Sequence, residues 1–572
     1  MIGSEGEVVD YHIRRLADLE RERKMWEPLW QDITDYVCPR RSFWDQTGWT
    51  AGKQPPQKTY DGTAISDLQL MVDGMQGNLV SPALPWLRLV MEDPRLQSLP
   101  NVADYLELLE QIFLAYYQKT AFYQAMNEFL MDMGSIGTAY MLVEDDVRNG
   151  QIVFSTRHPK ECYIAENHNN VVDVLYRSYS LANRQFLQTW PETVDPRRAE
   201  FAKTIPFGTG RILHATFPSA DESFMVPKEP RGPYCSIYID LDMKRILDIG
   251  AFNSFPYLVG RWRKNSDETY GRSPAADAIQ DILRINQMAK SLLQSAQLAN
   301  QPPLMVPAGM QGRERIVPMG FNYYTNPQER IIPIEVARNY PIARDQEEAV
   351  RQQIHDIFRT KVFLILQQLQ QGNYTATEIR QRIAEQVAVL SPVIGRFNAE
   401  VLVPLIRRTY QILDASGALP APPPTLLRGA RVKIEFQGPL AQAQKLAHRT
   451  QGVIAGLEFL ERLARMFPDS LDNADPDELA RVGMDTAGMP QRIIREVPAV
   501  EMLRKRRADA MARQQAAQMQ AAQSQAAMQN ADKLNRPVVS GSMLEAMGKA
   551  QAQAAAGGAK AAAPEGAVPG AE

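Results

Sequence analysis

The sequence has few cysteines and no long apolar stretch. Its 572 residues include only three cysteines, Cys38, Cys162 and Cys235, which lie far apart in the chain. This number and spacing exclude a disulfide framework or a Cys-x-x-Cys metal site, and the prediction is three buried, reduced thiols. No apolar run reaches the roughly 18–20 residues that a membrane-spanning helix needs. Met1–Asp10 is acidic and lacks the apolar core of a secretory signal. We therefore expect no membrane partner.

Motifs of the common enzyme classes are also missing. The sequence contains no GxxxxGK[S/T] loop for a triphosphate, no HExxH, no GxSxG and no GxGxxG after an expected strand. Its six histidines do not cluster at ligand spacing, and His355 is most simply a polar-face or core histidine. The carboxylate pairs Asp240/Asp242 and Asp145/Asp146 are weak candidates for a metal, and a turn or strand end is the simpler interpretation of Asp240/Asp242. We expect no catalytic residue, metal or cofactor.

Charge and apolar content are close to those of ordinary globular proteins. Lys and Arg total 63 against 66 Asp and Glu, a net charge of −3, and 45% of the residues are hydrophobic. This balance argues against global disorder and against a protein that coats itself with DNA by bulk charge. Length alone suggests about three to four domains.

The N-terminal half has the pattern of a mixed α+β structure. Asn169-Asn170 resembles a hairpin turn between two strands of this half. Apolar spacing of three to four residues predicts helices over 10–38, 61–79, 102–118 and 121–133. Alternating patterns predict strands over 86–91, 139–144, 151–157, 171–179, 211–217, 234–240 and 255–262.

Two long helices are expected to flank a compact insert. The first begins at Pro274, ends before Pro302 and is roughly 40 Å long at about 1.5 Å per residue. The second runs from Pro341 to 369, and 303–340 holds short β-like pieces. The first helix has an apolar stripe rich in small residues, which a neighbouring helix can approach closely. We call it the seam, and its members are Ala278, Ile282, Ile285, Ala289, Leu292 and Ala296.

Polar and basic segments are the candidates for contact with nucleic acid. Uncharged side chains of a loop can hydrogen-bond a phosphate backbone without the counterion release that makes binding tight. Such a loop consists of Gln370, Gln371, Gly372, Asn373 and Tyr374, with an ordinary solvated loop as the alternative. A basic run on an expected helix is either a solvated face or a phosphate contact, and it consists of Arg504, Lys505, Arg506 and Arg507.

Basic residues also surround Trp262, namely Arg261, Arg263 and Lys264. This interleaving can bind single strands. A strand edge whose charges balance Asp267 and Glu268 is the preferred interpretation.

The remainder of the chain is predicted to be mostly helical. A long helix over 377–415 is expected to kink at Pro392 and Pro404, and 431–436 is an expected strand. Helices dominate from 440 to about 530, and 514–530 is a helix-prone Gln/Ala/Met stretch. The Ala, Gly and Pro composition of 534–572 predicts disorder. The fold class is therefore mixed α+β and mostly helical.

Six segments, in their order and spacing, resemble the head-to-tail connecting (portal) proteins of short-tailed, podovirus-like bacteriophages. They are Tyr60–Ala64 with Gly74, Gly77, Ser81-Pro82 and Pro85–Leu89; Gly137–Glu144; Val171–Asp173 with Tyr176-Arg177 and Gln185-Phe186; Arg261-Trp262 with Tyr270–Pro274; Thr375–Ile379 with Arg382 and Glu385; and Gly438–Lys445. Together they span about residues 10–450.

The resemblance implies a ring of copies, in this family a dodecamer, at one capsid vertex. Double-stranded DNA is packaged and later ejected through its channel. The implied partners are the terminase large subunit, a tail adaptor or tail tube protein, the major capsid protein and the scaffolding protein. The implied location is the virion, after assembly in the host cytoplasm. Reduced cysteines agree with that compartment.

The resemblance also implies a division of the chain. A channel loop would include Gln370–Tyr374, and a clip between the two stem helices would dock the motor and later the tail. The implied parts are a wing over 1–265, stem helix 1 over 266–300, the clip over 301–340, stem helix 2 over 341–369, the channel loop and long wing helix over 370–436, a helical crown over 437–533, and a disordered tail over 534–572.

Two alternatives stay open on the sequence alone. The first alternative to a portal is a helical scaffold or adaptor of a virion, without a channel. The second is a nucleic-acid-processing enzyme. The enzyme would need converging carboxylates for metal ions.

Overall fold

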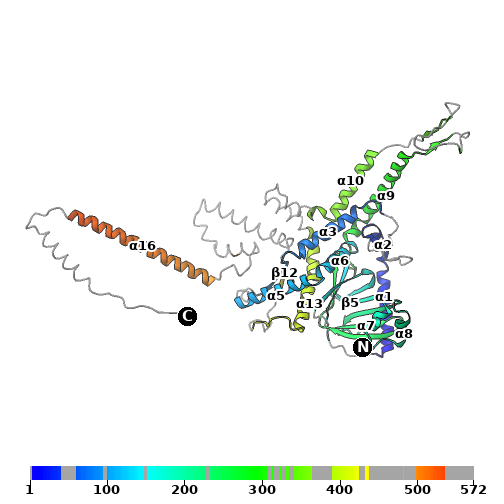
Figure 1. The fold of residues 1–572 in the computed structure, drawn as a ribbon, viewed down its shortest axis with the longest axis horizontal. Coiled ribbons are helices and arrows are strands. Elements are labelled where there is room, and N and C mark those ends of the chain that lie inside the picture. Colours follow the sequence, from blue (N-terminus) through cyan, green and yellow to red (C-terminus); the bar gives the residue numbers. More distant parts are fainter. Residues whose placement is uncertain are drawn as a thin grey trace, which may run out of the picture. The chain divides into compact units, whose positions relative to one another are not determined.

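The computed structural model describes residues 3–39, 59–93, 99–146, 151–226, 232–306, 312, 323, 330–333, 340–363, 389–423, 432–436, 481 and 497–534. By its contacts the chain divides into two compact units, Met1–Asp472 and Asn473–Glu572, described separately here. The first unit combines small antiparallel sheets with a larger helical part (Figure 1). This confirms the expected fold class.

A five-stranded antiparallel sheet dominates one part of the first unit. Its strands, in spatial order, are β4 (Cys162–Glu166), β5 (Val172–Ala182), β6 (Thr209–Pro218), β7 (Tyr234–Asp240) and β8 (Arg245–Phe252). The turn between β4 and β5 contains Asn170 at φ 59°, as the Asn-Asn pair predicted. The sequence patterns missed β4 and β8. The first three residues of β4 are all buried, so this short strand has no alternating pattern.

Helices cover both faces of this sheet. On one face, helix α1 (Glu5–Arg23) packs Val8, Leu16 and Leu19 against the strands. On the other, Phe186 joins Ile212 and Leu247 in a separate small cluster. Phe186 belongs to α7 (Asn183–Thr189), which with α8 (Pro196–Thr204) connects β5 to β6.

The single helix predicted over 10–38 is wrong, because the structure has two helices there. Helix α1 ends at Arg23 and α2 (Glu27–Tyr36) follows after a turn. Pro28 has no N–H to bond the carbonyl of Lys24, which favours a break at this point. The buried Arg23 guanidinium donates to the carbonyls of Lys160 and Cys162 at 2.6 and 3.1 Å and so fixes the end of α1.

The largest core cluster lies around a three-stranded sheet in the order β3-β2-β9. These strands are β2 (Thr138–Asp146), β3 (Gln151–Arg157) and β9 (Tyr257–Arg261), close to the predicted ranges. Helices pack around them, and their bounds are α3 (Thr63–Leu79), α5 (Pro100–Lys119) and α6 (Phe122–Ser135).

Two distant segments form a separate antiparallel pair, β1 (Leu87–Met91) with β12 (Val432–Phe436). Both strands lie where the sequence predicted them. The Leu89 amide, on the edge of β1, donates to Glu110 Oε1 of α5 at 2.6 Å. Burial raises the pKa of Glu110 to about 7. The side chain therefore blocks an open strand edge at the cost of burying an ionisable group.

We expect Glu110→Gln to remove a pH-dependent loss of stability. Between the unfolded pKa of 4.5 and about 7, the folded chain holds a proton that the unfolded chain has released. Wild-type stability therefore falls as pH rises through this window, by about 3 kcal/mol in all. Glutamine still accepts the Leu89 amide but cannot ionise, so the variant gains this amount relative to wild type between pH 4.5 and 8. Urea unfolding at pH 4.5 and pH 8 measures this gain in the free energy of unfolding. Asp104→Asn, on the same helix, is the control. Equal pH profiles of stability for wild type and Glu110→Gln would contradict the prediction.

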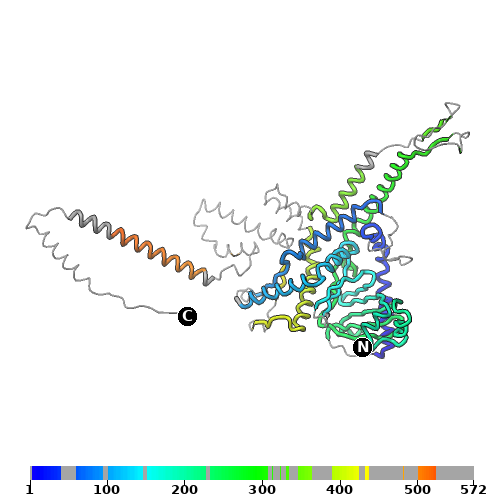
Figure 2. The backbone as a smooth tube through the Cα atoms, in the orientation of Figure 1, coloured from blue at the N-terminus to red at the C-terminus, as the bar shows by residue number. Residues whose placement is uncertain are grey.

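The two long helices are α9 (Pro274–Asn300) and α10 (Tyr340–Ile357). They pack against each other and extend from the body of the unit, as Figure 2 shows in green. Between them, β10 (Leu304–Met305) pairs antiparallel with β11 (Ile332–Pro333), where β-like pieces were predicted.

The second long helix was predicted to continue to 369, but α10 ends at Ile357. Arg359 adopts a positive φ of 57°, and the chain is helical again over 360–363. The Thr360 hydroxyl donates to the carbonyl of His355 at 3.2 Å, an acceptor that a continuing helix would offer to the Arg359 amide. Residues 364–388 lie outside the described part, and with them the predicted loop Gln370–Tyr374 and its members Gln371, Gly372 and Asn373.

The described part of the predicted long wing helix is Val389–Ala415. By length and composition alone this helix could cross a membrane, although the sequence has no uninterrupted apolar run of that length. Its apolar residues, among them Phe397, Leu402 and Leu405, lie in the main core cluster, as expected for a core helix. The irregularity expected at Pro404 is a π-helical segment, Asn398–Leu402, directly before α13 (Val403–Ala415). Helix 389–397 is not interrupted at Pro392.

The second unit is described mainly through α16 (Val497–Leu534), which confirms the helix predicted over 514–530. The basic run Arg504, Lys505, Arg506 and Arg507 lies on this helix and is exposed. Most of the predicted crown before α16, and all residues after Leu534, lie outside the described part.

Candidate functional site: the root of the two long helices

The start of α9 is fixed by a capping serine. Ser273 Oγ accepts from the Ala276 amide at 2.9 Å and donates to the carbonyl of Ser135 at 2.5 Å. Pro274 occupies the first turn, where its missing N–H is tolerated. The cap therefore attaches α9 to the end of α6.

Two glycines make the close contact next to this cap. Gly137, at φ +97°, and Gly271 approach so closely that a Cβ on either residue would lie 2.3 Å from the other's carbonyl oxygen. The Gly271 amide donates to Thr138 Oγ1 at 2.8 Å, and the Trp262 amide donates to the Gly137 carbonyl at 3.0 Å. Thus the segments Gly137–Glu144 and Tyr270–Pro274, which the resemblance singled out separately, meet in space.

A third singled-out segment, Tyr60-Asp61, contacts both long helices. The amides of Tyr60 and Asp61 donate to Asn286 Oδ1 of α9 at 2.6 and 3.3 Å. Arg351 of α10 donates to Asp61 Oδ2 at 3.0 Å. The Asp61 carboxylate also accepts the Thr63 amide at the start of α3, although the N-cap residue of this helix is Gly62. Burial opposes the charge, but the bonds from Thr63 and Arg351 hold the pKa of Asp61 below its usual range.

Helix α3 also contacts α10 at His355 and the helical segment 360–363 that follows α10. His355 Nδ1 lies 2.7 Å from Asp67 Oδ2, so His355 is a paired histidine on the helix face that contacts α3. Burial raises the pKa of Asp67, and His355 opposes this. Further along, a Cβ on Gly74 would lie 2.3 Å from the ring of Phe363. We call this region, in which α3, α9 and α10 join, the helix root.

Beyond the helix root the seam of α9 divides into two halves. Ala278, Ile282 and Ile285 are buried within the chain's own core. The remaining members, Ala289, Leu292 and Ala296, are only partly buried. Leu293 and Leu298, on the same half of the helix, are 49% and 42% exposed. The outer half of α9 therefore carries apolar surface that the described part of the chain leaves uncovered.

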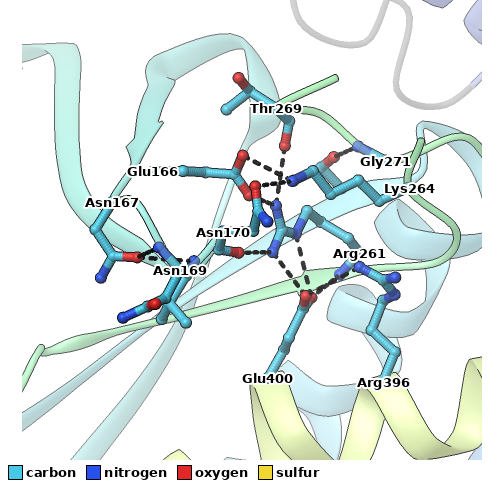
Figure 3. A network of polar contacts seen from close by, with 12 residues as sticks. Glu166, Asn167, Asn169, Asn170, Arg261, Lys264, Thr269, Gly271, Arg396 and Glu400 are labelled. Atoms are coloured by element: carbon cyan, nitrogen blue, oxygen red, sulfur yellow. Dashed lines mark hydrogen bonds and ion pairs between the residues drawn. The ribbon is translucent and has the colours of Figure 1, made fainter. Parts of the chain in front are cut away.

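Arg261 forms the centre of a polar network beside the helix root (Figure 3). Its guanidinium donates to Glu400 Oε1 at 2.7 Å and also pairs with Glu166. Lys264 Nζ lies 2.8 Å from Glu166 Oε2. The side chain of Arg261 is 2% exposed, and the positive charge of its neighbour Lys264 is likewise neutralised.

This network corrects the prediction for the basic residues around Trp262. Arg261 and Lys264 are balanced by Glu166 and Glu400, not by Asp267 and Glu268. Glu268 instead pairs with Arg272. Trp262 is buried and so offers no stacking surface to a single strand. Sequence distance hid these partners, since Glu166 and Glu400 are 95 and 139 residues away.

The two carboxylate pairs that were weak metal candidates, Asp240/Asp242 and Asp145/Asp146, lie at a turn and at a strand end. Arg198 donates to Asp240 and Asp242, each at 2.8 Å, and both carboxylates lie at the turn after β7, which confirms the simpler interpretation. Asp145 and Asp146 lie at the end of β2. Among the described residues, no group of three or more His, Cys, Asp and Glu side chains is placed to hold a metal ion. The three cysteines are buried, as predicted.

Comparison with known proteins gives matches over most of the chain. The family described as "Bacteriophage head to tail connecting protein" matches residues 10–494. The chain is 28% identical over 514 residues to the "Probable portal protein" of Bordetella phage BPP-1, covering 88% of this chain and 92% of that protein. It is 26% identical over 521 residues to the "Portal protein" of Salmonella phage epsilon15, covering 88% and 93%.

A solved structure also matches, "Neck of empty GTA particle computed with C6 symmetry". The match has a TM-score of 0.31 and 11% sequence identity, and it covers 74% of this chain and 90% of that chain. We draw no conclusion from a likeness of this degree.

Proposed function

Because the chain belongs to the bacteriophage head to tail connecting protein family, we propose that its copies form a closed ring through which double-stranded DNA passes. The chain is a portal, or head-tail connector, at the capsid vertex of a virion. DNA enters through the ring during packaging and leaves through it during infection. The protein's role is structural, with no bond chemistry.

The observation that carries the ring is the uncovered outer half of α9. Ala289, Leu292 and Ala296 continue an apolar seam that is buried near the helix root and only partly buried beyond it. A helix about 40 Å long cannot bury such a seam against one short partner. In a ring, each copy offers one surface to the copy on its left and a different surface to the copy on its right, and the series closes by rotation. We infer twelve copies from the family resemblance.

The partners and the channel contacts follow from the same assignment. The insert 301–340 is proposed as the clip, which binds the terminase large subunit during packaging and the tail adaptor or tail tube protein afterwards. The major capsid protein and the scaffolding protein contact the ring during assembly in the host cytoplasm. The uncharged loop Gln370–Tyr374 is proposed to face the DNA, and the exposed basic run beginning at Arg504 to contact phosphates.

Ring closure can be tested by enlarging the seam where it is partly exposed. We expect Ala289→Phe with Ala296→Phe to abolish closed rings, because two phenyl rings would hold neighbouring helices apart. Negative-stain electron microscopy of the purified chain shows whether closed rings form, and we expect wild type to form rings with a central hole. The matched control is Gln287→Phe with Gln294→Phe, exposed positions on the opposite face of the same helix. Intact rings in the alanine variant would contradict the seam, and wild-type monomers at high concentration would contradict the ring.

A further inference from the structure

Helix Val389–Ala415 carries one residue more than a regular α-helix would need. Its π segment, Asn398–Leu402, closes with the Val403 amide on the carbonyl of Asn398, five residues back. Pro404 follows directly and has no amide for a regular bond to Glu400. Single-turn π segments of this kind occur often at functional positions.

The burial pattern shows why the extra residue is there. Buried positions before the π segment are Leu390, Val393, Ile394 and Phe397, and those from its last residue onward are Leu402, Leu405, Ile406, Arg408, Thr409 and Leu413. On a continuous α-helix the centres of these two stripes would differ by about 100°, the turn of one residue. The π segment takes up this residue, so both stripes face the same core.

Glu400 lies within this segment. Without the extra residue, if the residue removed comes before it, Glu400 would be turned by about 100° relative to the stripe that precedes the segment. With it, the Glu400 carboxylate accepts from the Arg261 amide at 3.0 Å and from the Arg261 guanidinium at 2.7 Å. Gly260, beside Arg261, permits this approach, because a Cβ there would lie 2.7 Å from Val401.

Arg261 in turn contacts two other parts of the chain. It donates to the carbonyl of Thr269 at 3.2 Å, in the loop that ends at the Ser273 cap of α9. It also pairs with Glu166 and donates to the carbonyl of Asn170 at 3.1 Å, both in the hairpin between β4 and β5. One buried guanidinium therefore joins the π segment, the start of α9 and the five-stranded sheet.

We propose that the π segment exists to present Glu400 to Arg261, and that Arg261 thereby couples helix Val389–Ala415 mechanically to the start of α9. A displacement of this helix is passed to the loop 261–273 through the ion pair. The coupling acts within one chain, so it does not depend on ring formation or on the proposed function.

Hydrogen–deuterium exchange of the full-length chain, read by mass spectrometry, tests this coupling. In Glu400→Gln one of the two carboxylate charges that hold Arg261 is lost, the one from the π segment, and we expect amides of 261–273 to exchange about tenfold faster. These include the amides of Trp262 and Arg272, which bond the carbonyls of Gly137 and Arg263. Asp414→Asn, at an exposed position of the same helix, is the control and leaves 261–273 unchanged. Strand β6 serves as the internal reference for global stability.

Deletion of Ala399, an exposed residue within the π segment, provides the second variant. It aligns both apolar stripes on one helix that Pro404 still bends, so amides of 389–415 stay protected while 261–273 exchanges faster. Faster exchange confined to 396–404 in Glu400→Gln would overturn the coupling. Loss of protection along the whole helix on deletion, or wild-type exchange over 261–273, would overturn the role given to the extra residue.

Discussion

Acidification from pH 7 to 4 is expected to lower the free energy of unfolding by about 3 kcal/mol for each of two buried histidines. Burial lowers the pKa of His12 to about 4 and, with the charges of Arg177 and Arg157, that of His214 to about 3. Between pH 6.5 and these values the unfolded chain binds protons that the folded chain does not. Stability is therefore fully present above pH 6.5 and is lost as pH falls.

The contacts of the two rings explain why both are held neutral. His12 Nε2 donates to the carbonyl of Met225 at 2.9 Å, so Nδ1 is left to accept from the Tyr176 hydroxyl at 2.6 Å. The His214 ring stacks on Tyr238, with ring centroids 4.1 Å apart, and its nitrogens bond to the hydroxyl groups of Tyr257 in β9 and Ser236 in β7. No carboxylate among these contacts would stabilise an imidazolium ion.

Urea unfolding at pH 7 and pH 4 measures this effect. The variants His12→Gln and His214→Gln should each show a smaller loss of stability between the two pH values than wild type. His168→Gln, in the exposed turn between β4 and β5, is the control and should keep the wild-type loss. If His12→Gln and His214→Gln both keep the full wild-type loss, the acid sensitivity does not come from these rings.

Local sequence patterns predicted the regular elements well where one apolar period runs without interruption. Helix α9 is the clearest case, because a first-turn proline and a three-to-four stripe indicate the same start and period. The break after Ile357 was missed because it depends on a side-chain bond from Thr360 to a backbone carbonyl. The π segment is detectable in principle, since two stripes of one helix are offset by a single residue, but only burial shows which residues belong to each stripe.

The polar contacts of the helix root were much less predictable. Arg261 was assigned partners close in the sequence, whereas its carboxylates come from β4 and from the π segment. Tertiary structure brings such groups together, and the sequence around each one gives no indication of the other. Residues that proved central, including Asn286 and Arg351, also have no local signature. Two of the segments that the resemblance singled out meet there, because glycines at 137 and 271 allow their backbones to come into contact.

The second large effect is expected from Arg198→Met. Arg198 Nη2 lies 2.8 Å from Asp240 Oδ1, and the two side chains are only 4% and 1% exposed. Removing the guanidinium leaves a buried carboxylate without its counter-charge, which typically costs about 3–5 kcal/mol. Asp240 would keep only the amides of Asp242 and Met243, at 3.0 and 3.1 Å. The end of β7 and the packing of α8 should therefore be strongly destabilised.

Two further variants separate the loss of the ion pair from the loss of packing. Adding Asp240→Asn to Arg198→Met removes the unpaired charge while keeping an oxygen for the two amides, so a large part of the stability should return. Arg211→Met is the control, because Arg211 is 68% exposed and lies 3.6 Å from Asp242, and a pair of that kind contributes about 0–1 kcal/mol. Urea unfolding at pH 7 gives all three values. If Arg198→Met lowered the free energy of unfolding no more than Arg211→Met does, the buried charge of Asp240 would not be the cause of the destabilisation.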